Sequence, residues 1–460
     1  MTTLELETVL RDAAGPNGWS NDPEIIKPRL TDWRGRRHGD ARLLLRPATV
    51  DAIQAIVRVA GQHRIALVPQ GGRTGLVGGG LPEPGRPSVL LSLERLNRIR
   101  SVDAEGMMLV AEAGVALQTI HEAAAAVHCR FPLSLAAKGS ATIGGLVSTN
   151  AGGTQVLRHG TMRARVLGLE AVMADGSLLA GLSGLRKDNT GYDIKQLLIG
   201  AEGTLGIVTA AALALAPIPP ERAVAWAGVT SPAAALQLLT ALRSAVGEQV
   251  ESFELMPGDA AALVAMHIGG RDPLPGHPWV VLIEVAGVGV APGLESALAH
   301  CADKALIAAN DTQAAALWAI REWLPEAERR DGLAAKHDIA LPVAAVPAFM
   351  AEVTPALEAR FAGASVLAFG HLGDGNLHYN VRIPAGAGAD WLTANGPEIT
   401  AHIHEAVVAR GGSISAEHGI GSIKREDLAR FGNPIKLVAM RAVKRALDPF
   451  NIMNPGKLFA

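Results

Sequence analysis

The distribution of apolar and polar residues predicts alternating helices and strands in the first half of the chain. Ile53, Ile56 and Ala60 recur at the spacing of an amphipathic helix, and Thr49 precedes them as a candidate N-cap. A second helix is expected over 116–127, and short apolar runs predict strands over 65–70, 88–93 and 108–114. This alternation predicts an α+β fold for the chain up to about residue 217.

Changes in composition indicate the domain boundaries. The proline-rich segment 213–223 marks a break, and helical patterns over 231–246 and 342–361 with an apolar run over 279–287 indicate a second α+β domain beyond it. We therefore expect an N-terminal lead-in (1–40), a first domain (41–217), a second domain (218–400) and a helical C-terminal segment (401–460).

Charge and cysteine content exclude several classes of protein. The 460 residues carry a net charge of -2, so a broad nucleic-acid-binding surface is not expected. The two cysteines form no CxxC motif and indicate a reducing compartment. No uncharged apolar run is long enough for a transmembrane helix, and Glu5 and Glu7 stand where a secretory signal would be basic. We expect a cytoplasmic protein.

Glycine is concentrated in three clusters, over 68–80, 136–155 and 199–215. Glycine-rich turns beside strands can crowd backbone N–H groups around a phosphate, although tight turns alone are the alternative interpretation. No cluster continues as GKS or GKT, and none contains GxGxxG. A P-loop and a nicotinamide-binding Rossmann domain are therefore disfavoured.

A second group of residues has the chemistry of a metal site. The segment GHLGDGNLHYN places His371 and His378 around a turn between two predicted strands, and SAEHGIG adds Glu417 and His418. Two imidazoles and a carboxylate are a common ligand set for a divalent metal such as Zn²⁺. Histidines that cap or fill a polar core are the alternative.

Taken in order, these segments resemble one family. PQGGRTGLVGG, AKGSATIGGLVSTNAGG, VLGLEAVMADGS, LRKDNTGYDIKQLLIGAEGTLGIVT, GHLGDGNLHYN, SAEHGIG and LDPFNIMNPGK follow the order found in FAD-binding oxidoreductases of the vanillyl-alcohol oxidase (PCMH-type) superfamily. The similarity is to its D-2-hydroxyglutarate and D-lactate dehydrogenase branch. It implies an FAD-binding domain of two α+β subdomains, an α+β substrate (cap) domain and a C-terminal helical segment that returns to the flavin.

The resemblance also implies which residues contact FAD. Family members that bind FAD covalently often have a histidine in the first loop, where this chain has Gly-Gly-Arg-Thr, so dissociable FAD is expected. The implied contacts are Pro69, Gly71, Gly72, Arg73, Thr74, Gly75, Ser134, Gly139, Ser140, Thr142, Gly144, Gly145, Asn150, Gly152, Glu202, Gly203, Gly206, Ile207 and Asn454.

For the substrate, the resemblance implies that His418 is the catalytic base. Metal ligands are implied at His371, His378 and Glu417, and substrate contacts at Arg321, Lys336, Asn380, His371 and Glu417. One departure is Pro325, where relatives have a substrate-binding threonine. Because proline cannot donate that hydrogen bond, the identity of the substrate stays open.

The expected reaction is the metal-assisted oxidation of a D-2-hydroxy acid, with D-2-hydroxyglutarate as the first choice of substrate. A neutral histidine can take the hydroxyl proton while hydride moves to flavin N5. An electron-transfer flavoprotein or a quinone is the expected acceptor, and the chain is expected to form a homodimer. Alternatives are a D-lactate, glycolate or D-malate dehydrogenase on the same scaffold, a zinc hydrolase, and a non-catalytic flavin subunit.

Overall fold

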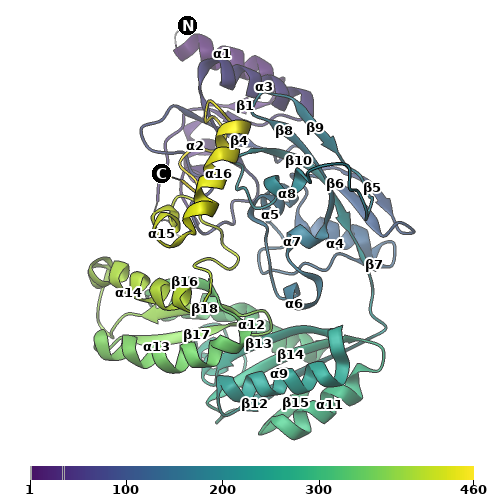
Figure 1. The fold of residues 1–460 in the computed structure, drawn as a ribbon, viewed down its shortest axis with the longest axis vertical. Coiled ribbons are helices and arrows are strands. Elements are labelled where there is room, and N and C mark those ends of the chain that lie inside the picture. The colour runs from purple at the N-terminus through teal and green to yellow at the C-terminus, as the bar shows by residue number, and fades with distance from the viewer. Residues whose placement is uncertain (1–2, 34, 36, 460) are drawn as a thin grey trace. The chain divides into compact units, whose positions relative to one another are not determined.

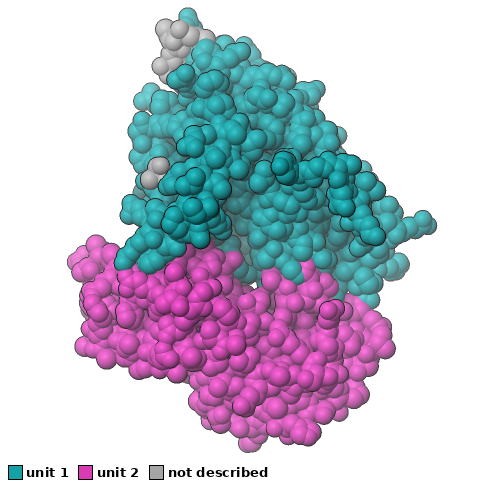
Figure 2. Space-filling view, in the orientation of Figure 1, with its two compact units in different colours: residues 1–153, 160–218, 417–460 teal, residues 154–159, 219–416 magenta. Residues whose placement is uncertain are grey.

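The computed structural model describes residues 3–33, 35 and 37–459 of the chain (Figure 1). It divides into two compact units, which Figure 2 colours separately. Unit 1 comprises Met1–Gly153, Gly160–Ile218 and Glu417–Ala460, and unit 2 comprises Thr154–His159 and Pro219–Ala416. The predicted α+β class is confirmed for the described residues.

Unit 1 begins with a four-stranded sheet in the order β1-β2-β4-β3. Its elements are α1 (Thr3–Ala14), β1 (Trp19–Ser20), α2 (Pro23–Ile26), the 3-10 turn Lys27–Arg29, β2 (Leu44–Leu45), α3 (Val50–His63), β3 (Ala66–Gln70) and β4 (Ser88–Ser92). The predicted cap of α3 is present, because the Thr49 side chain accepts a hydrogen bond from the backbone N–H of Ala52. Helix α3 buries Ile53, Ile56 and Ala60 as predicted.

A five-stranded antiparallel sheet in the order β5-β6-β10-β8-β9 completes the centre of unit 1. Its strands are β5 (Ile99–Asp103), β6 (Met108–Glu112), β8 (Val166–Met173), β9 (Leu178–Gly181) and β10 (Gly206–Ala214). Around it lie α4 (Leu117–Ala125), the pair β7 (Cys129–Arg130) and β11 (Ala216–Pro217), α5 (Ile143–Thr149), α7 (Met162–Arg165) and α8 (Lys195–Leu198). Helices α15 (Arg425–Phe431) and α16 (Pro434–Leu447) precede the C-terminal tail.

Unit 2 is built on a seven-stranded antiparallel sheet in the order β15-β12-β14-β13-β17-β18-β16. The strands are β12 (Glu221–Val229), β13 (Val250–Pro257), β14 (Trp279–Gly287), β15 (Lys304–Ile307), β16 (Ala334–Ala340), β17 (Ser365–His371) and β18 (Asn376–Arg382). The helices are α6 (Val156–His159), α9 (Pro232–Val246), α10 (Ala260–His267), α11 (Val290–Cys301), α12 (Asp311–Asp331), α13 (Val346–Arg360) and α14 (Ala389–Ala409), with 3-10 turns at Gly247–Gln249 and Val343–Ala345.

Both faces of this sheet are covered by helices. Along β12, Ala225 and Ala227 face a core shared with α9, α11, α13 and α14, whereas Val224 and Trp226 face a second core shared with α10 and α12. This alternation is the period of two expected of a strand buried on both sides. The second face matters for the site, because α12 covers polar strand residues there.

The limits of the units differ from the predicted segments at two places. Helix α14 runs without interruption through residues 400 and 401, and unit 2 continues to Ala416. Residues 154–159 group with unit 2 although the chain on either side belongs to unit 1. Residues 401–416 therefore group with unit 2, and only the chain from Glu417 onward returns to unit 1.

Candidate cofactor and substrate sites

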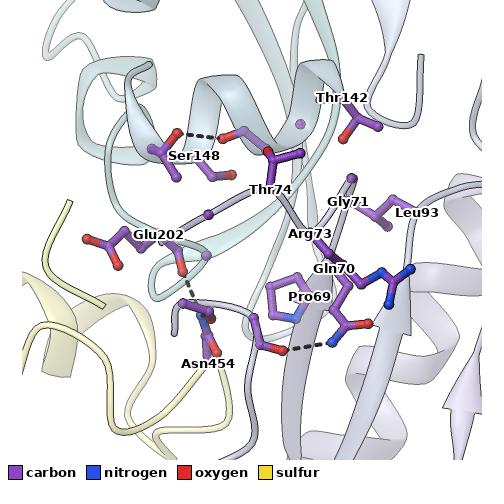
Figure 3. Close-up of a pocket in the computed structure, with 18 of the residues that line it drawn as sticks. Pro69, Gln70, Gly71, Arg73, Thr74, Leu93, Thr142, Ser148, Glu202 and Asn454 are labelled. Atoms are coloured by element: carbon purple, nitrogen blue, oxygen red, sulfur yellow. Dashed lines mark hydrogen bonds between the residues drawn. The ribbon is translucent and has the colours of Figure 1, made fainter. Parts of the chain in front are cut away.

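Unit 1 contains a cavity whose walls come from segments far apart in the sequence (Figure 3). Residues from the loop 71–80 after β3, from α5 and from the segment 202–208 line it, together with Asn454. The tail reaches this cavity by adding to β3, since the N–H of Leu67 donates to the carbonyl of Ile452 at 2.8 Å and the N–H of Asn454 donates to the carbonyl of Leu67 at 2.9 Å. The C-terminal tail therefore lies beside the strand that leads into the first glycine cluster.

Two glycines of the first loop are required by close packing. A Cβ atom on Gly71 would collide with Oγ1 of Thr142, and one on Gly72 would collide with the backbone oxygen of Ser140. These contacts bring the first glycine loop against the start of α5. Arg73 follows in the left-handed region at φ 56°, and its Nη1 donates to the carbonyl of Pro28 at 2.8 Å.

Polar atoms in the cavity wall fit a polar ligand. Thr142 Oγ1, Gln70 Oε1 and Asn454 Oδ1 are buried and have no hydrogen-bond partner among the described residues. Figure 3 shows these three side chains around the same space, among glycines and small residues. Because an unsatisfied buried polar atom is costly, the wall is suited to a cofactor that offers hydrogen-bonding groups along its length. The residues present therefore fit FAD.

The cavity contains most of the predicted cofactor residues but not all of them. Fourteen line it, namely Pro69, Gly71, Gly72, Arg73, Thr74, Gly75, Thr142, Gly144, Gly145, Glu202, Gly203, Gly206, Ile207 and Asn454. The other five, Ser134, Gly139, Ser140, Asn150 and Gly152, are not among the lining residues. Gly139 and Ser140 are exposed, and Asn150 Oδ1 instead accepts from the N–H of Arg163 at 2.9 Å.

Sequence reasoning missed other lining residues. Gln70 and Ser148 lie beside predicted contacts, and Trp33 lies in the lead-in. The side-chain Nε2 of Gln70 donates to the carbonyls of Arg29 and Gly80, which fixes the turn of the first loop. The nearby glycine motifs are the only signal that marks Gln70 and Ser148, whereas no sequence pattern marks Trp33.

Glu202 connects the cavity to the predicted base. Its carboxylate accepts hydrogen bonds from the N–H groups of Ile420 and Gly421, each at 2.7 Å, and its own carbonyl accepts from Nδ2 of Asn454 at 2.7 Å. Burial raises the pKa of Glu202, an effect that the two N–H donors partly oppose. His418, two residues before Ile420, lines the same cavity. Glu202 therefore fixes the loop that carries His418.

Glu417 is held within unit 1 by the end of the second glycine cluster. Its Oε1 accepts from the N–H of Gly153 at 2.6 Å. The preceding Gly152 must lack a side chain, because a Cβ atom there would lie 2.5 Å from the same oxygen. The close approach of the Glu417 carboxylate thus explains Gly152, whereas Gly153 is required by its φ of 133° and by the backbone oxygen of Ser134, with which a Cβ atom there would collide.

In unit 2, the predicted hairpin is confirmed as β17 and β18. His378 lies on β18 opposite Asp338 of β16, and its Nδ1 is 3.9 Å from Oδ1 of that aspartate. The ring centroids of His371 and His378 are 5.8 Å apart. The strand pairing thus brings the two predicted histidine ligands together, beside an aspartate that the sequence did not single out.

Two predicted substrate residues, Asn380 and Lys336, lie on the same strands as His378 and Asp338. Asn380 follows His378 by two positions on β18, and Lys336 lies opposite Asn380 on β16. Both donate to Oε2 of Glu328 on α12, at 2.6 Å from Lys336 Nζ and 3.0 Å from Asn380 Nδ2. Glu328 is 1% exposed, and its Oε1 has no partner among the described residues.

Arg321 lies on α12 and forms an ion pair with a different carboxylate, that of Glu254. Its Nε donates to Oε2 of Glu254 at 2.8 Å, and Oε1 of Glu254 is 2.5 Å from Nδ1 of His371. Burial alone would raise the pKa of Glu254, but His371 and Arg321 outweigh it and lower the pKa to about 2. Glu254 and Glu328 were missed from the sequence, although they hold four of the predicted site residues in place.

The chain is similar to known flavin-dependent proteins over nearly its whole length. Residues 41–181 match the family model "FAD binding domain", and residues 218–458 match "FAD linked oxidases, C-terminal domain". The mitochondrial D-2-hydroxyglutarate dehydrogenase of Bos taurus is 38% identical over 95% of this chain and 80% of that protein. The D-2-hydroxyglutarate dehydrogenase of Xanthomonas citri pv. viticola is 38% identical over 95% of this chain and 93% of the relative.

A solved structure supports the expected fold. p-Cresol methylhydroxylase with substrate bound superimposes with a TM-score of 0.76 over 99% of this chain and 96% of that chain, at 15% identity. The predicted PCMH-type fold is thereby confirmed. Among the described residues, no helix combines the length and the apolar character that crossing a bilayer requires.

Proposed function

Since this chain belongs to the family of FAD-dependent D-2-hydroxyglutarate dehydrogenases, we propose that it oxidises D-2-hydroxyglutarate to the corresponding 2-oxo acid. The structural observation that supports this proposal is the polar sheet face of unit 2. There, Lys336 and Asn380 of the sheet and Arg321 of helix α12 lie near His371 and His378. Such a set can bind a carboxylate and a hydroxyl group at the same time.

FAD is the proposed electron acceptor in the first half-reaction. When bound, it takes up the hydrogen that leaves C2 of the substrate together with two electrons. The residues that would hold it are the glycine loop at Gly71 and Gly72, Thr142, and Asn454 of the tail, whose buried polar atoms suit its hydrogen-bonding groups. Because the first loop contains no histidine, we propose that the FAD dissociates on acid precipitation.

A divalent cation, Zn²⁺ as the first choice, is proposed at His371, His378 and Glu417. When bound, it would stabilise negative charge on the substrate oxygen. The charges at this sheet face support a cation, because with neutral imidazoles the carboxylates of Glu254, Glu328 and Asp338 outnumber the cations Arg321 and Lys336 by one. Without an added positive charge, this surplus would oppose an anionic substrate.

The side chains of this enzyme then have separate tasks. His418 accepts the proton of the C2 hydroxyl, which lets the carbon lose its hydrogen with the bonding electrons. Arg321 is paired with Glu254 through Nε, so its terminal nitrogens lie outside that ion pair and suit a substrate carboxylate. Lys336 and Asn380 supply further donors, already oriented by Glu328. The substrate thus loses one hydride and one proton, and the product is the 2-oxo acid.

A second candidate substrate follows from Pro325. This residue lies one helical turn after Arg321 in α12, and it offers neither a side-chain hydroxyl nor a backbone N–H. A distal carboxylate therefore loses one potential donor near Arg321. D-lactate and glycolate, which have no distal carboxylate, are the alternatives that Pro325 favours, and D-malate, which keeps one, stays an alternative on the same scaffold.

Anaerobic mixing with a panel of 2-hydroxy acids tests the proposal. We expect the visible flavin absorbance to bleach with D-2-hydroxyglutarate, with the highest kcat/KM of the panel, and to persist with the L-enantiomer. Faster bleaching with D-lactate, D-malate or glycolate would assign the alternative substrate. A colourless protein with hydrolase activity, or a yellow protein that no 2-hydroxy acid reduces, would refute the dehydrogenase function.

The substrate panel does not test three further expectations. Reoxidation by an electron-transfer flavoprotein or a quinone, assembly as a homodimer and a cytoplasmic location stay predictions.

His418→Ala gives a direct test of the base, since we expect flavin to remain bound while its reduction by substrate is lost. Unchanged bleaching in this variant would contradict the role of His418.

A further inference from the structure

We propose that Glu254 is a positioning residue that fixes the tautomer of His371 and the orientation of Arg321, and thereby couples cation binding to substrate binding. This inference rests on the proposed function, because it concerns the ligand and the substrate-binding residue assigned there. It adds a residue that no motif of the chain marked. The observation behind it is that one buried carboxylate contacts both side chains, one with each oxygen.

The position of Glu254 is fixed by the backbone. It lies on β13 and pairs in register with His371 at the end of β17, so the two side chains are neighbours across the sheet. Glu254 is fully buried, and Arg321 reaches it from α12 with 6% of its surface exposed. Nε of Arg321 lies 2.8 Å from Oε2, and Nδ1 of His371 lies 2.5 Å from Oε1.

This geometry determines which imidazole nitrogen carries the proton. A carboxylate accepts hydrogen bonds and cannot donate them, so the neutral imidazole of His371 bonds to Glu254 through Nδ1–H. The lone pair then lies on Nε2, the nitrogen suited to a cation. Histidine ligands commonly donate their other ring N–H to a carboxylate, which orients the ring and raises its basicity.

The same carboxylate also holds the substrate arginine. The Arg321 guanidinium lies 5.1 Å from the ring centroid of Phe369, which is 5.2 Å from the ring of His378. Loss of Glu254 would leave the buried cation of Arg321 without its ion pair, and an uncompensated buried charge is strongly unfavourable. A disturbance at Glu254 must therefore reach both the histidine pair and the carboxylate-binding group.

Glu254→Gln tests the tautomer directly. Arg321 can only donate, so the amide oxygen of the new side chain would face it. The amide NH2 group would then face Nδ1 of His371, which would have to accept, and the ring proton would move to Nε2. The variant keeps the size of the side chain at position 254 but switches His371 to the other tautomer.

Glu328→Gln is the matched control. Glu328 is also buried, yet within the described part of the chain its Oε2 receives both Lys336 and Asn380 while its Oε1 has no hydrogen-bond partner. The amide oxygen can take the place of Oε2 and the NH2 group that of Oε1. This change should alter substrate binding and leave cation binding alone.

The experiment measures Zn²⁺ affinity of the flavin-loaded, chelator-treated protein by competition with a chelating indicator. We expect Glu254→Gln to weaken Zn²⁺ binding by about 10- to 100-fold, to raise KM for the 2-hydroxy acid, and to keep wild-type FAD content. Glu328→Gln should retain the wild-type Zn²⁺ dissociation constant. Wild-type Zn²⁺ affinity in Glu254→Gln would overturn the inference.

A second measurement keeps the inference testable if Glu254→Gln does not fold. Nitrogen-15 NMR of histidine-labelled, metal-free wild-type protein reports the tautomer, and His371→Ala identifies the relevant signal. We expect the proton on Nδ1, and a proton on Nε2 would refute the proposal. Wild-type protein that neither binds Zn²⁺ nor oxidises 2-hydroxy acids would instead refute the proposed function.

Discussion

Oε2 of Glu202 accepts a hydrogen bond from the backbone N–H of Gly421 at 2.7 Å, although the two residues are 219 positions apart in the chain. Oε1 of Glu202 binds Ile420 in the same way, so one carboxylate holds two consecutive N–H groups. Gly421 itself needs to be glycine, because its φ of 54° is left-handed and a Cβ atom would collide with the backbone of Val77. The loop after His418 is therefore determined by contacts within the flavin unit.

Glu202→Gln should slow flavin reduction by substrate. The amide NH2 group would face a backbone N–H, and the loop that carries His418 would shift. Displacement of a catalytic group by about 1 Å can cost 10²-fold in rate, so we expect at least a tenfold loss in stopped-flow experiments. Glu83→Gln is the control, because Glu83 binds the Arg425 side chain of the same segment and not the loop backbone. Equal rates in the two variants would argue against this role of Glu202.

Gly72→Ala should reduce FAD content. The new methyl group would collide with the Ser140 backbone and push the first glycine loop away from α5. Gly139→Ala is the matched comparison, since Gly139 is exposed, lies outside the cavity wall and has open space where a Cβ would stand. The ratio of flavin to protein absorbance measures the effect. Loss of FAD in Gly139→Ala would show that Gly139 contacts FAD, as the resemblance to the family implies.

Local sequence signals predicted the elements that local interactions determine. The N-cap at Thr49 and the hairpin of β17 and β18 depend on residues close in the chain, and both are present. Helix α14 shows the opposite case, because the helical periodicity was expected to begin only at about Ile399, whereas the helix starts at Ala389. The end of the predicted second domain at residue 400 was placed on this local periodicity.

Glu254 and Glu328 show why the supporting carboxylates could not be predicted. In β13, Glu254 alternates with Phe253 and Leu255, a pattern typical of a strand with one solvated face. That face is instead covered by α12, which buries Glu254 against Arg321. Only the tertiary packing reveals that the polar face is internal, whereas the histidine and glycine motifs stand out in the sequence itself.

Removal of metal should abolish turnover without loss of flavin. We expect protein dialysed against a chelator to be yellow and inactive, and added Zn²⁺ to restore activity. His371→Ala and His378→Ala should lose bound metal, whereas His300→Ala, at the exposed end of α11, should keep it. Full turnover by metal-free protein would contradict the metal assignment.

The stability of unit 1 should depend on pH through Glu112 of β6. Its side chain is 1% exposed and accepts from Nη2 of Arg98 at 3.0 Å and from Nε of Arg100 at 3.3 Å. Burial would raise its pKa, but the hydrogen bonds from Arg98 and Arg100 outweigh this and lower it. A folded-state pKa below the unfolded value adds stability at pH values above the unfolded pKa, and this stability disappears as the pH falls through the folded pKa.

Glu112→Gln should therefore lower the melting temperature near neutral pH, through a loss of about 1–3 kcal/mol of unfolding free energy. The difference from wild type should shrink as the pH falls below about 4.3, the ordinary pKa of glutamate, because the wild-type carboxyl then takes up its proton. Calorimetry of FAD-saturated protein across this range measures the effect. Glu105→Gln, in the exposed turn between β5 and β6, should show no such trend. A difference in melting temperature between wild type and Glu112→Gln that stays constant or widens in acid would mean that the arginine pair does not depress the pKa of Glu112.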